Sequence, residues 1–151
     1  MLFSVCIDRM ARWSSEPAPN AVTVTLSGDF FAVLADLARH YFAERTDEQI
    51  GICIEITAES RRNPNVARIH QAFDADVKAR LIAILQRAAE RGEIARDIDM
   101  ANVATMLMVI VDGVWNRRVS DPSFDPKTLL PLFMDVTRHM LRAPAAGSAQ
   151  S

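Results

Sequence analysis

Few side chains in this sequence have types and spacings that could do chemistry. The histidines His40, His70 and His139 stand far apart, without the spacing of metal ligands. Cys6 and Cys53 form no C-x-x-C pattern, so we expect two reduced thiols and no metal site. A cysteine nucleophile would also need a neighbouring base, which the sequence does not show. We therefore expect no catalytic residue and no cofactor.

Motifs for other chemistry are also missing from the sequence. The chain contains no Gly-rich phosphate loop, no G-x-S-x-G and no Glu-x-x-His pair. Its net charge of −2 gives no electrostatic reason to expect binding to nucleic acid or to a membrane surface. The charged N-terminus lacks the apolar run of a signal peptide, and no uncharged run approaches the ~18 residues of a membrane span. These features favour a cytoplasmic binding protein.

A second group of candidates lies on or beside the apolar faces of expected helices, as in sites for small, mostly apolar ligands. The eight candidates are Leu34, Tyr41, Glu55, Thr57, His70, Phe73, Met106 and Ile110. Each has a structural alternative: the apolar members could fill an ordinary core, and His70 could be a hydrogen-bonded core histidine. Glu55 could simply pair with Arg62. Asp112 is a carboxylate at a buried edge that could satisfy a neighbouring helix or touch a ligand.

Helices must position these side chains, because apolar residues recur at helical spacing along most of the chain. The expected helices cover residues 1–13, 30–44, 46–62, 64–91, 99–120 and 126–143. Residues 14–29 are expected to form a loop, and residues 144–151 a disordered tail. We therefore predict a single all-α domain over residues 1–143.

Local signals set the expected helix ends. Thr46 begins a T-x-x-Q capping box, and Asn63-Pro64 is a favourable helix start. Gly92 suits a left-handed C-cap, and Asp99 and Asp125-Pro126 suit the starts of the next two helices. Pro131 is expected to kink the last helix near its beginning.

The helix expected over residues 99–120 is apolar around most of its circumference, whereas a surface helix shows one apolar stripe. We therefore expect it to contact a second copy of the chain as well as its own core. The predicted interface consists of Leu107, Val111, Trp115, Leu129, Phe133, Val136 and Met140. The alternative is that both helices are simply central in a monomer core.

Residues 30–143 resemble the C-terminal domain of TetR-family transcriptional regulators, most closely the branch with a BetI-type domain. Five motifs carry the resemblance: A-E-x-x-R-N-P from Ala58, R-G-E-I from Arg91, D-x-D at Asp97, D-G-V-W from Asp112 and D-P-S-F-D-P from Asp121. Each motif is weak alone, but their order and spacing together are specific. The resemblance implies a bundle of about six helices whose last two form a four-helix dimer interface.

The resemblance also implies a function. Family members bind a small, mostly apolar effector between their middle helices, and this binding alters the spacing of two DNA-reading heads. Residues 1–13 stand where the linker helix of the family would be, and the helix-turn-helix is not found in this sequence. We therefore expect a homodimer that meets DNA only through a missing N-terminal domain.

Two other functions remain open at this stage. One is a stand-alone dimeric ligand-binding protein, or a partner that inactivates a full-length relative by forming heterodimers. The other is a small helical enzyme. An in-frame helix-turn-helix coding sequence upstream of Met1 would favour the regulator, and turnover of a substrate would favour the enzyme.

Overall fold

The computed structural model describes residues 30–141, which are helical and contain no strand. The predicted helix at 1–13, the loop at 14–29 and the tail at 144–151 lie outside the described residues. The elements are α2 (Phe30–Arg39), the π-helical turn η1 (His40–Glu44), α3 (Asp47–Ser60), α4 (Pro64–Glu90), α5 (Met100–Ser120), the 3₁₀ turn η2 (Pro126–Leu129) and α6 (Leu130–Leu141). The prediction of an all-α fold is confirmed.

The predicted caps of the middle helices are present. The Thr46 hydroxyl accepts from the Gln49 amide at 3.2 Å, and the Gln49 side chain accepts from the Thr46 amide at 3.1 Å. Asn63 caps α4, with Pro64 at the first helical position. Gly92 has φ +75° directly after α4, a left-handed conformation that favours glycine. Local chemistry therefore sets where these helices begin and end.

The last helix begins differently from the prediction. Asp125 caps a 3₁₀ turn, η2, and the α-helix follows only from Leu130. Pro131 is therefore the second residue of α6, in the first turn, where its missing N–H would have had no partner. The irregularity falls before the proline, so Pro131 does not interrupt an established helix.

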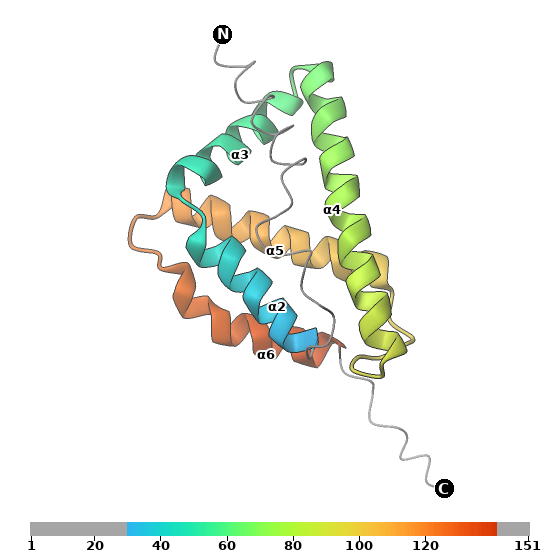
Figure 1. The fold of residues 1–151 in the computed structure, drawn as a ribbon. Coiled ribbons are helices and arrows are strands. Elements are labelled where there is room, and N and C mark those ends of the chain that lie inside the picture. The colour runs from blue at the N-terminus through green and yellow to red at the C-terminus, as the bar shows by residue number, and fades with distance from the viewer. Residues whose placement is uncertain (1–29, 142–151) are drawn as a thin grey trace, which may run out of the picture.

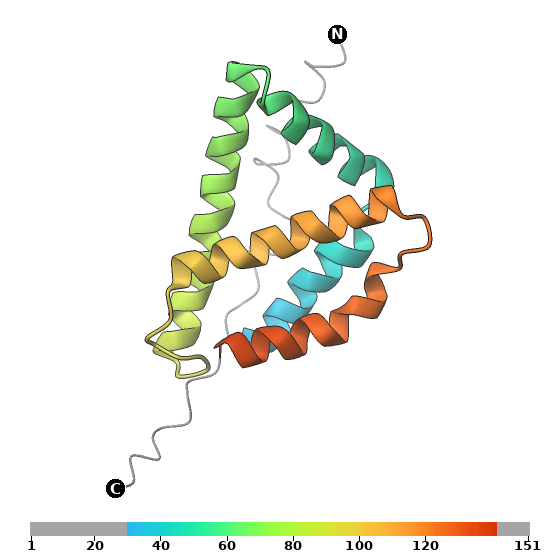
Figure 2. The same ribbon diagram turned by 180° about the vertical axis from the view of Figure 1, so that it is seen from behind.

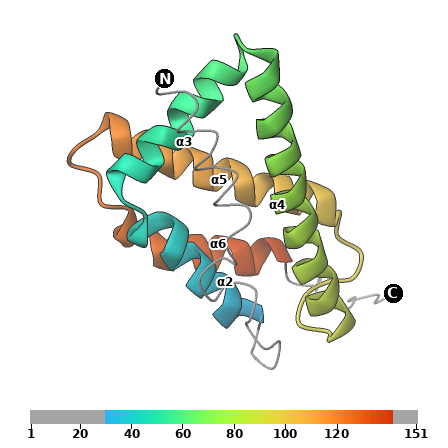
Figure 3. The same cartoon turned by 45° about the horizontal axis from the view of Figure 1, so that its top comes forward.

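The helices form two groups that share α5. In Figure 1, α3, α4 and α5 are the sides of a triangle, and each packs against the other two. α2 and η1 pack along η2 and α6 below the triangle, an arrangement that Figure 3 shows from a second direction. Within residues 30–141, no helix is long and apolar enough to cross a membrane.

The main apolar core lies where α2 and α5 begin and α4 and α6 end. Its buried members are Phe30, Leu34, Leu85, Ala88, Ala89, Ile94, Ala104 and Leu141. At the opposite end of α2, the rings of Phe42 and Phe133 meet edge to face with centroids 5.1 Å apart. These contacts hold α2 and α6 together as one layer beside the triangle.

Candidate functional site

Polar side chains of α3 and α4 meet where these two helices pack against each other. The Thr57 Oγ1 lies 3.3 Å from His70 Nε2 and donates to the Cys53 carbonyl oxygen at 3.0 Å. Because a hydroxyl carries one hydrogen, His70 Nε2 must be the donor to Thr57. The other ring nitrogen, Nδ1, lies 3.5 Å from an Asp74 carboxylate oxygen and can donate to it when the ring is protonated. Two helices are thus joined through one histidine.

Asp112 brings α5 to the same cluster. Partial desolvation raises the pKa of the Asp112 carboxyl even though the residue is exposed, and the negative charge of Asp74 raises it further. His70 acts in the opposite direction and lowers the pKa of Asp112. We call Thr57, His70, Asp74 and Asp112 the polar cluster. It contains two carboxylates and one histidine, drawn from all three sides of the triangle.

An Asp112→Asn variant tests this electrostatic account. The pKa of Asp112 is higher in the folded state than in the unfolded state, so the ionised carboxyl is less favourable in the folded protein. Ionisation therefore lowers the free energy of unfolding at neutral pH. Below the unfolded pKa of about 4 the carboxyl is protonated, and this loss disappears. We expect Asp112→Asn to raise the melting temperature by about 2 °C at pH 7.5. The gain should vanish as the pH falls below about 4, where the carboxyl becomes protonated in both states.

Asp76→Asn is the matched control, because Asp76 forms an exposed ion pair with Arg80 on α4. This variant should not raise the melting temperature at either pH, since an exposed pair contributes little. A lower melting temperature for Asp112→Asn at pH 7.5 would contradict this account, because it would show that the folded protein stabilises the ionised carboxylate of Asp112.

Aromatic side chains of η1 and α5 lie beside the polar cluster. Trp115 Nε1 donates to the Tyr41 carbonyl oxygen at 2.8 Å, and the two rings lie 6.2 Å apart between centroids. The Arg45 guanidinium lies 5.3 Å from the centroid of the Tyr41 ring. Arg118 donates to the Arg45 carbonyl oxygen at 2.8 Å and pairs with Asp47. α5 therefore holds the irregular turn η1 in position.

Cys53 is a partly buried thiol between these groups. Burial raises the pKa of the Cys53 thiol and Asp112 raises it as well, whereas Arg45 lowers it. The thiol is therefore protonated at neutral pH, in contrast to the low-pKa cysteines that act as nucleophiles. Among the described residues, no group of three His, Cys, Asp or Glu side chains is arranged to hold a metal ion.

The structure brings together only some of the predicted ligand-binding residues. Thr57 and His70 belong to the polar cluster, and Tyr41 lies beside Trp115 at its edge. Phe73 is half-buried and Glu55 is exposed. Arg62 pairs with Glu59 at 2.8 Å, so the suggested pair between Glu55 and Arg62 is not formed.

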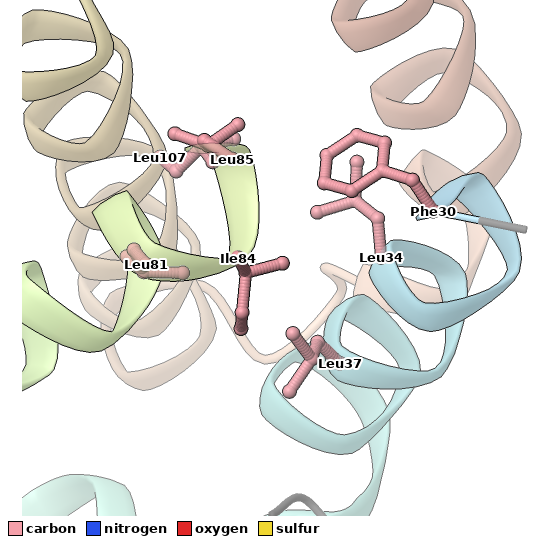
Figure 4. A pocket seen from close by; sticks show the side chains of 7 residues that line it. All are labelled: Phe30, Leu34, Leu37, Leu81, Ile84, Leu85 and Leu107. Atoms are coloured by element: carbon pink, nitrogen blue, oxygen red, sulfur yellow. The ribbon is translucent and has the colours of Figure 1, made fainter. Parts of the chain in front are cut away.

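Leu34 lies in a different part of the molecule. It lines a small apolar cavity of about 10 Å³ between α2, α4 and α5, shown in Figure 4. Such a volume holds about one water molecule, whereas ligand pockets occupy roughly 300–1,000 Å³. Leu34 is therefore an ordinary core residue, which was the alternative interpretation.

Met106 and Ile110 point away from the polar cluster. At about 100° per residue, they lie roughly 120° and 160° around α5 from Asp112. Met106 is 50% exposed.

A broad open groove of about 490 Å³ lies elsewhere on the described residues and contains none of the eight candidates. It is lined by Gln86, Ala89, Glu90, Arg96 and Met100.

Sequence reasoning missed Asp74 and left Asp112 unassigned. Asp74 follows His70 by four residues on one helix, a spacing that places both side chains on the same face. That signal was present in the sequence. The proximity of Asp112 to this pair was not, because it depends on how α5 crosses α4.

The outer sides of α5 and α6 expose large apolar side chains. Figure 2 shows α5 and α6 in front of α2, with part of α2 visible between them. We call Met106, Val109, Leu132 and Val136 the outer face, and their exposed fractions are 50%, 56%, 60% and 50%. Exposed apolar side chains of this size are of the kind found on interaction surfaces.

The predicted dimer interface coincides with this outer face only at Val136. Leu107 is 5% exposed and lines the small internal cavity, while Trp115 and Phe133 contact η1. Leu107 therefore belongs to the core of the chain itself, whereas Trp115 and Phe133 are half-buried and keep part of their surface exposed. Val111, Leu129 and Met140 are partly buried. α5 and α6 do expose apolar side chains, but apart from Val136 these are not the residues predicted for the interface.

Residues 30–141 form an all-α domain in which α3, α4 and α5 contribute to the polar cluster and α5 and α6 carry exposed apolar side chains; an all-α domain is what the TetR resemblance implied. A family model described as the C-terminal domain of BetI-type transcriptional repressors matches residues 32–142. The chain therefore belongs to this family. No match was found among curated proteins.

Proposed function

We propose that this chain is the effector-binding and dimerisation domain of a TetR-like transcriptional regulator. The observation that carries the proposal is the contact between Thr57 of α3 and His70 of α4, together with Asp112 of α5, which is near enough to His70 and Asp74 for their charges to change its pKa. A ligand that contacts all three helices can change their relative positions, which is what an effector must do. Family membership of the matched residues supports the same function.

The effector we propose is small and mostly apolar, with a polar group that contacts the cluster. The same helices carry aromatic surface: Trp115 follows Asp112 by one turn on α5 and contacts Tyr41, and the half-buried Phe73 directly precedes Asp74 on α4. Such a combination, mostly apolar with a few converging polar groups, is typical of small-molecule sites. Binding would shift the equilibrium between two arrangements of the domain only by as much as the affinities for the two differ.

We also propose that the domain forms a homodimer in the cytoplasm through its outer face. Met106 and Val109 of α5 and Leu132 and Val136 of α6 are half-exposed or more, and both helices lie in front of α2 in Figure 2. A two-fold dimer would place the same patch of both copies in contact. Binding to DNA would then require a separate DNA-binding domain on the same polypeptide or on a partner.

Native mass spectrometry of the gently purified full chain tests the ligand part of this proposal. We expect a dimer of twice 16.8 kDa that carries an additional small-molecule mass. His70→Ala should lower the affinity for that molecule about tenfold, because it removes a hydrogen-bonding group from the cluster.

Gln71→Ala is the matched control, since Gln71 is the exposed neighbour of His70 on α4. The control should retain the molecule at the level of the unmodified chain. If His70→Ala and Tyr41→Phe both retained it as well, the effector site would lie elsewhere. A bare protein that binds no compound from an apolar library would count against effector binding altogether.

A further inference from the structure

The loop that joins α4 to α5 (residues 91–99) contacts the ends of four helices. Its Asp99 carboxylate caps α5 by accepting from the Asn102 amide at 3.0 Å. Arg96 donates to the Ala89 carbonyl oxygen at 3.1 Å, at the end of α4. The Ala95 amide donates to the Leu141 carbonyl oxygen at 3.0 Å, at the end of α6. These bonds satisfy groups that a helix end otherwise leaves without partners.

The fourth helix end is the start of α2, and Glu93 holds it. A Glu93 carboxylate oxygen accepts from the Phe30 amide at 2.6 Å, across 63 positions of sequence. The other carboxylate oxygen pairs with Arg91 Nε. The first amides of a helix have no acceptor within the helix, and a negative charge there is favourable to the helix dipole. Glu93 therefore caps α2 from another part of the chain.

The remaining contact between α2 and α4 is apolar and adaptable. The cavity of about 10 Å³ lies between the two helices. Figure 4 shows Phe30, Leu34 and Leu37 of α2 on one side and Leu81, Ile84 and Leu85 of α4, with Leu107 of α5, on the other. Apolar contacts are non-directional, so they do not hold a helix end at one position as a short charge-assisted hydrogen bond does. The bond from Phe30 to Glu93 is a directional link at this junction.

We infer that Glu93 is a positioning residue that couples α4, and with it the polar cluster, to the start of α2. The inference rests on the proposed function only in taking the polar cluster as the effector site. His70 and Asp74 lie on α4, Glu93 follows the end of α4, and Phe30 is where the preceding part of the chain joins α2. A displacement of α4 on ligand binding would therefore move the point at which residues 1–29 connect to the domain.

Amide hydrogen exchange measured by NMR on the full chain tests the link itself. The Phe30 amide should exchange at least tenfold faster in Glu93→Ala than in the unmodified chain, because its acceptor is removed. Glu93→Gln should lie between the two, since an amide oxygen still accepts but carries no charge. Glu90→Ala, an exposed residue on the last turn of α4, is the control and should leave this amide unchanged.

Equal Phe30 exchange in Glu93→Ala and the unmodified chain would overturn the inference. Should Glu93→Ala fail to fold, as judged by circular dichroism, the comparison of Glu93→Gln with Glu90→Ala decides the question alone. Intermediate exchange in Glu93→Gln supports the link, and unchanged exchange overturns it.

A second measurement tests the coupling without any ligand. His70→Ala perturbs α4 at the polar cluster, and we expect it to shift the amide resonances of residues 31–33 in the unmodified background. The shift should be lost when Glu93→Ala or Glu93→Gln is also present. A shift that is equal in both backgrounds, or absent from both, would contradict coupling through Glu93. Neither result depends on whether an effector binds, so failure here is distinguishable from failure of the proposed function.

Discussion

A chain carrying both Val109→Glu and Leu132→Glu is expected to be monomeric under conditions in which the unmodified chain is a dimer. Both side chains are more than half exposed on the outer face, so their replacement leaves the core intact. In a two-fold interface each substitution occurs twice, and four carboxylates would have to be buried near one another. We expect the dimer dissociation constant to rise at least ~1,000-fold, or ~4 kcal/mol, as measured by sedimentation equilibrium.

Val119→Glu provides the control for this experiment. Val119 is 51% exposed and lies on the same helix, but it is rotated by roughly 80° from Val109 around α5. This variant should remain dimeric. Leu107→Glu should differ from both, because Leu107 is buried and a charge there should unfold the domain instead of separating two folded copies. A double variant that stays dimeric would place the interface on another surface.

Phe42→Ala is expected to cause a large loss of stability. Phe42 is fully buried in η1, and its ring packs edge to face on Phe133 of α6. Removing a buried Phe side chain costs about 3–5 kcal/mol, through lost apolar burial and the cavity left behind. Since small domains are stable by about 5–15 kcal/mol, the variant should be close to unfolding.

Urea denaturation followed by circular dichroism measures this loss. Phe42→Leu is the matched variant, because it retains most of the apolar volume and should lose considerably less stability than Phe42→Ala. The measurement should be made at one fixed protein concentration, since a dimer's apparent stability depends on concentration. A loss below about 1 kcal/mol for Phe42→Ala would show that η1 does not help to hold α2 on α6.

The sequence by itself determined most helix boundaries of the described residues. The capping box at Thr46, the start at Asn63-Pro64 and the left-handed Gly92 act through bonds and dihedral angles within a few residues. Such signals do not depend on the rest of the fold, which is why they can be read from the chain alone. The family resemblance is likewise carried by the order and spacing of short motifs.

Only the tertiary structure decided which face of each helix is used. α5 is apolar around most of its circumference, so its periodicity did not distinguish the buried Leu107 from the outward Val109. For the same reason, periodicity could not show that Leu34 lies in the core while Thr57 and His70 belong to the polar cluster. The proximity of Asp112 to His70 and the hydrogen bond between Glu93 and Phe30 involve residues far apart in sequence. Such contacts depend on crossing angles and loop paths, which arise from the packing of whole helices and leave no local signal in the chain.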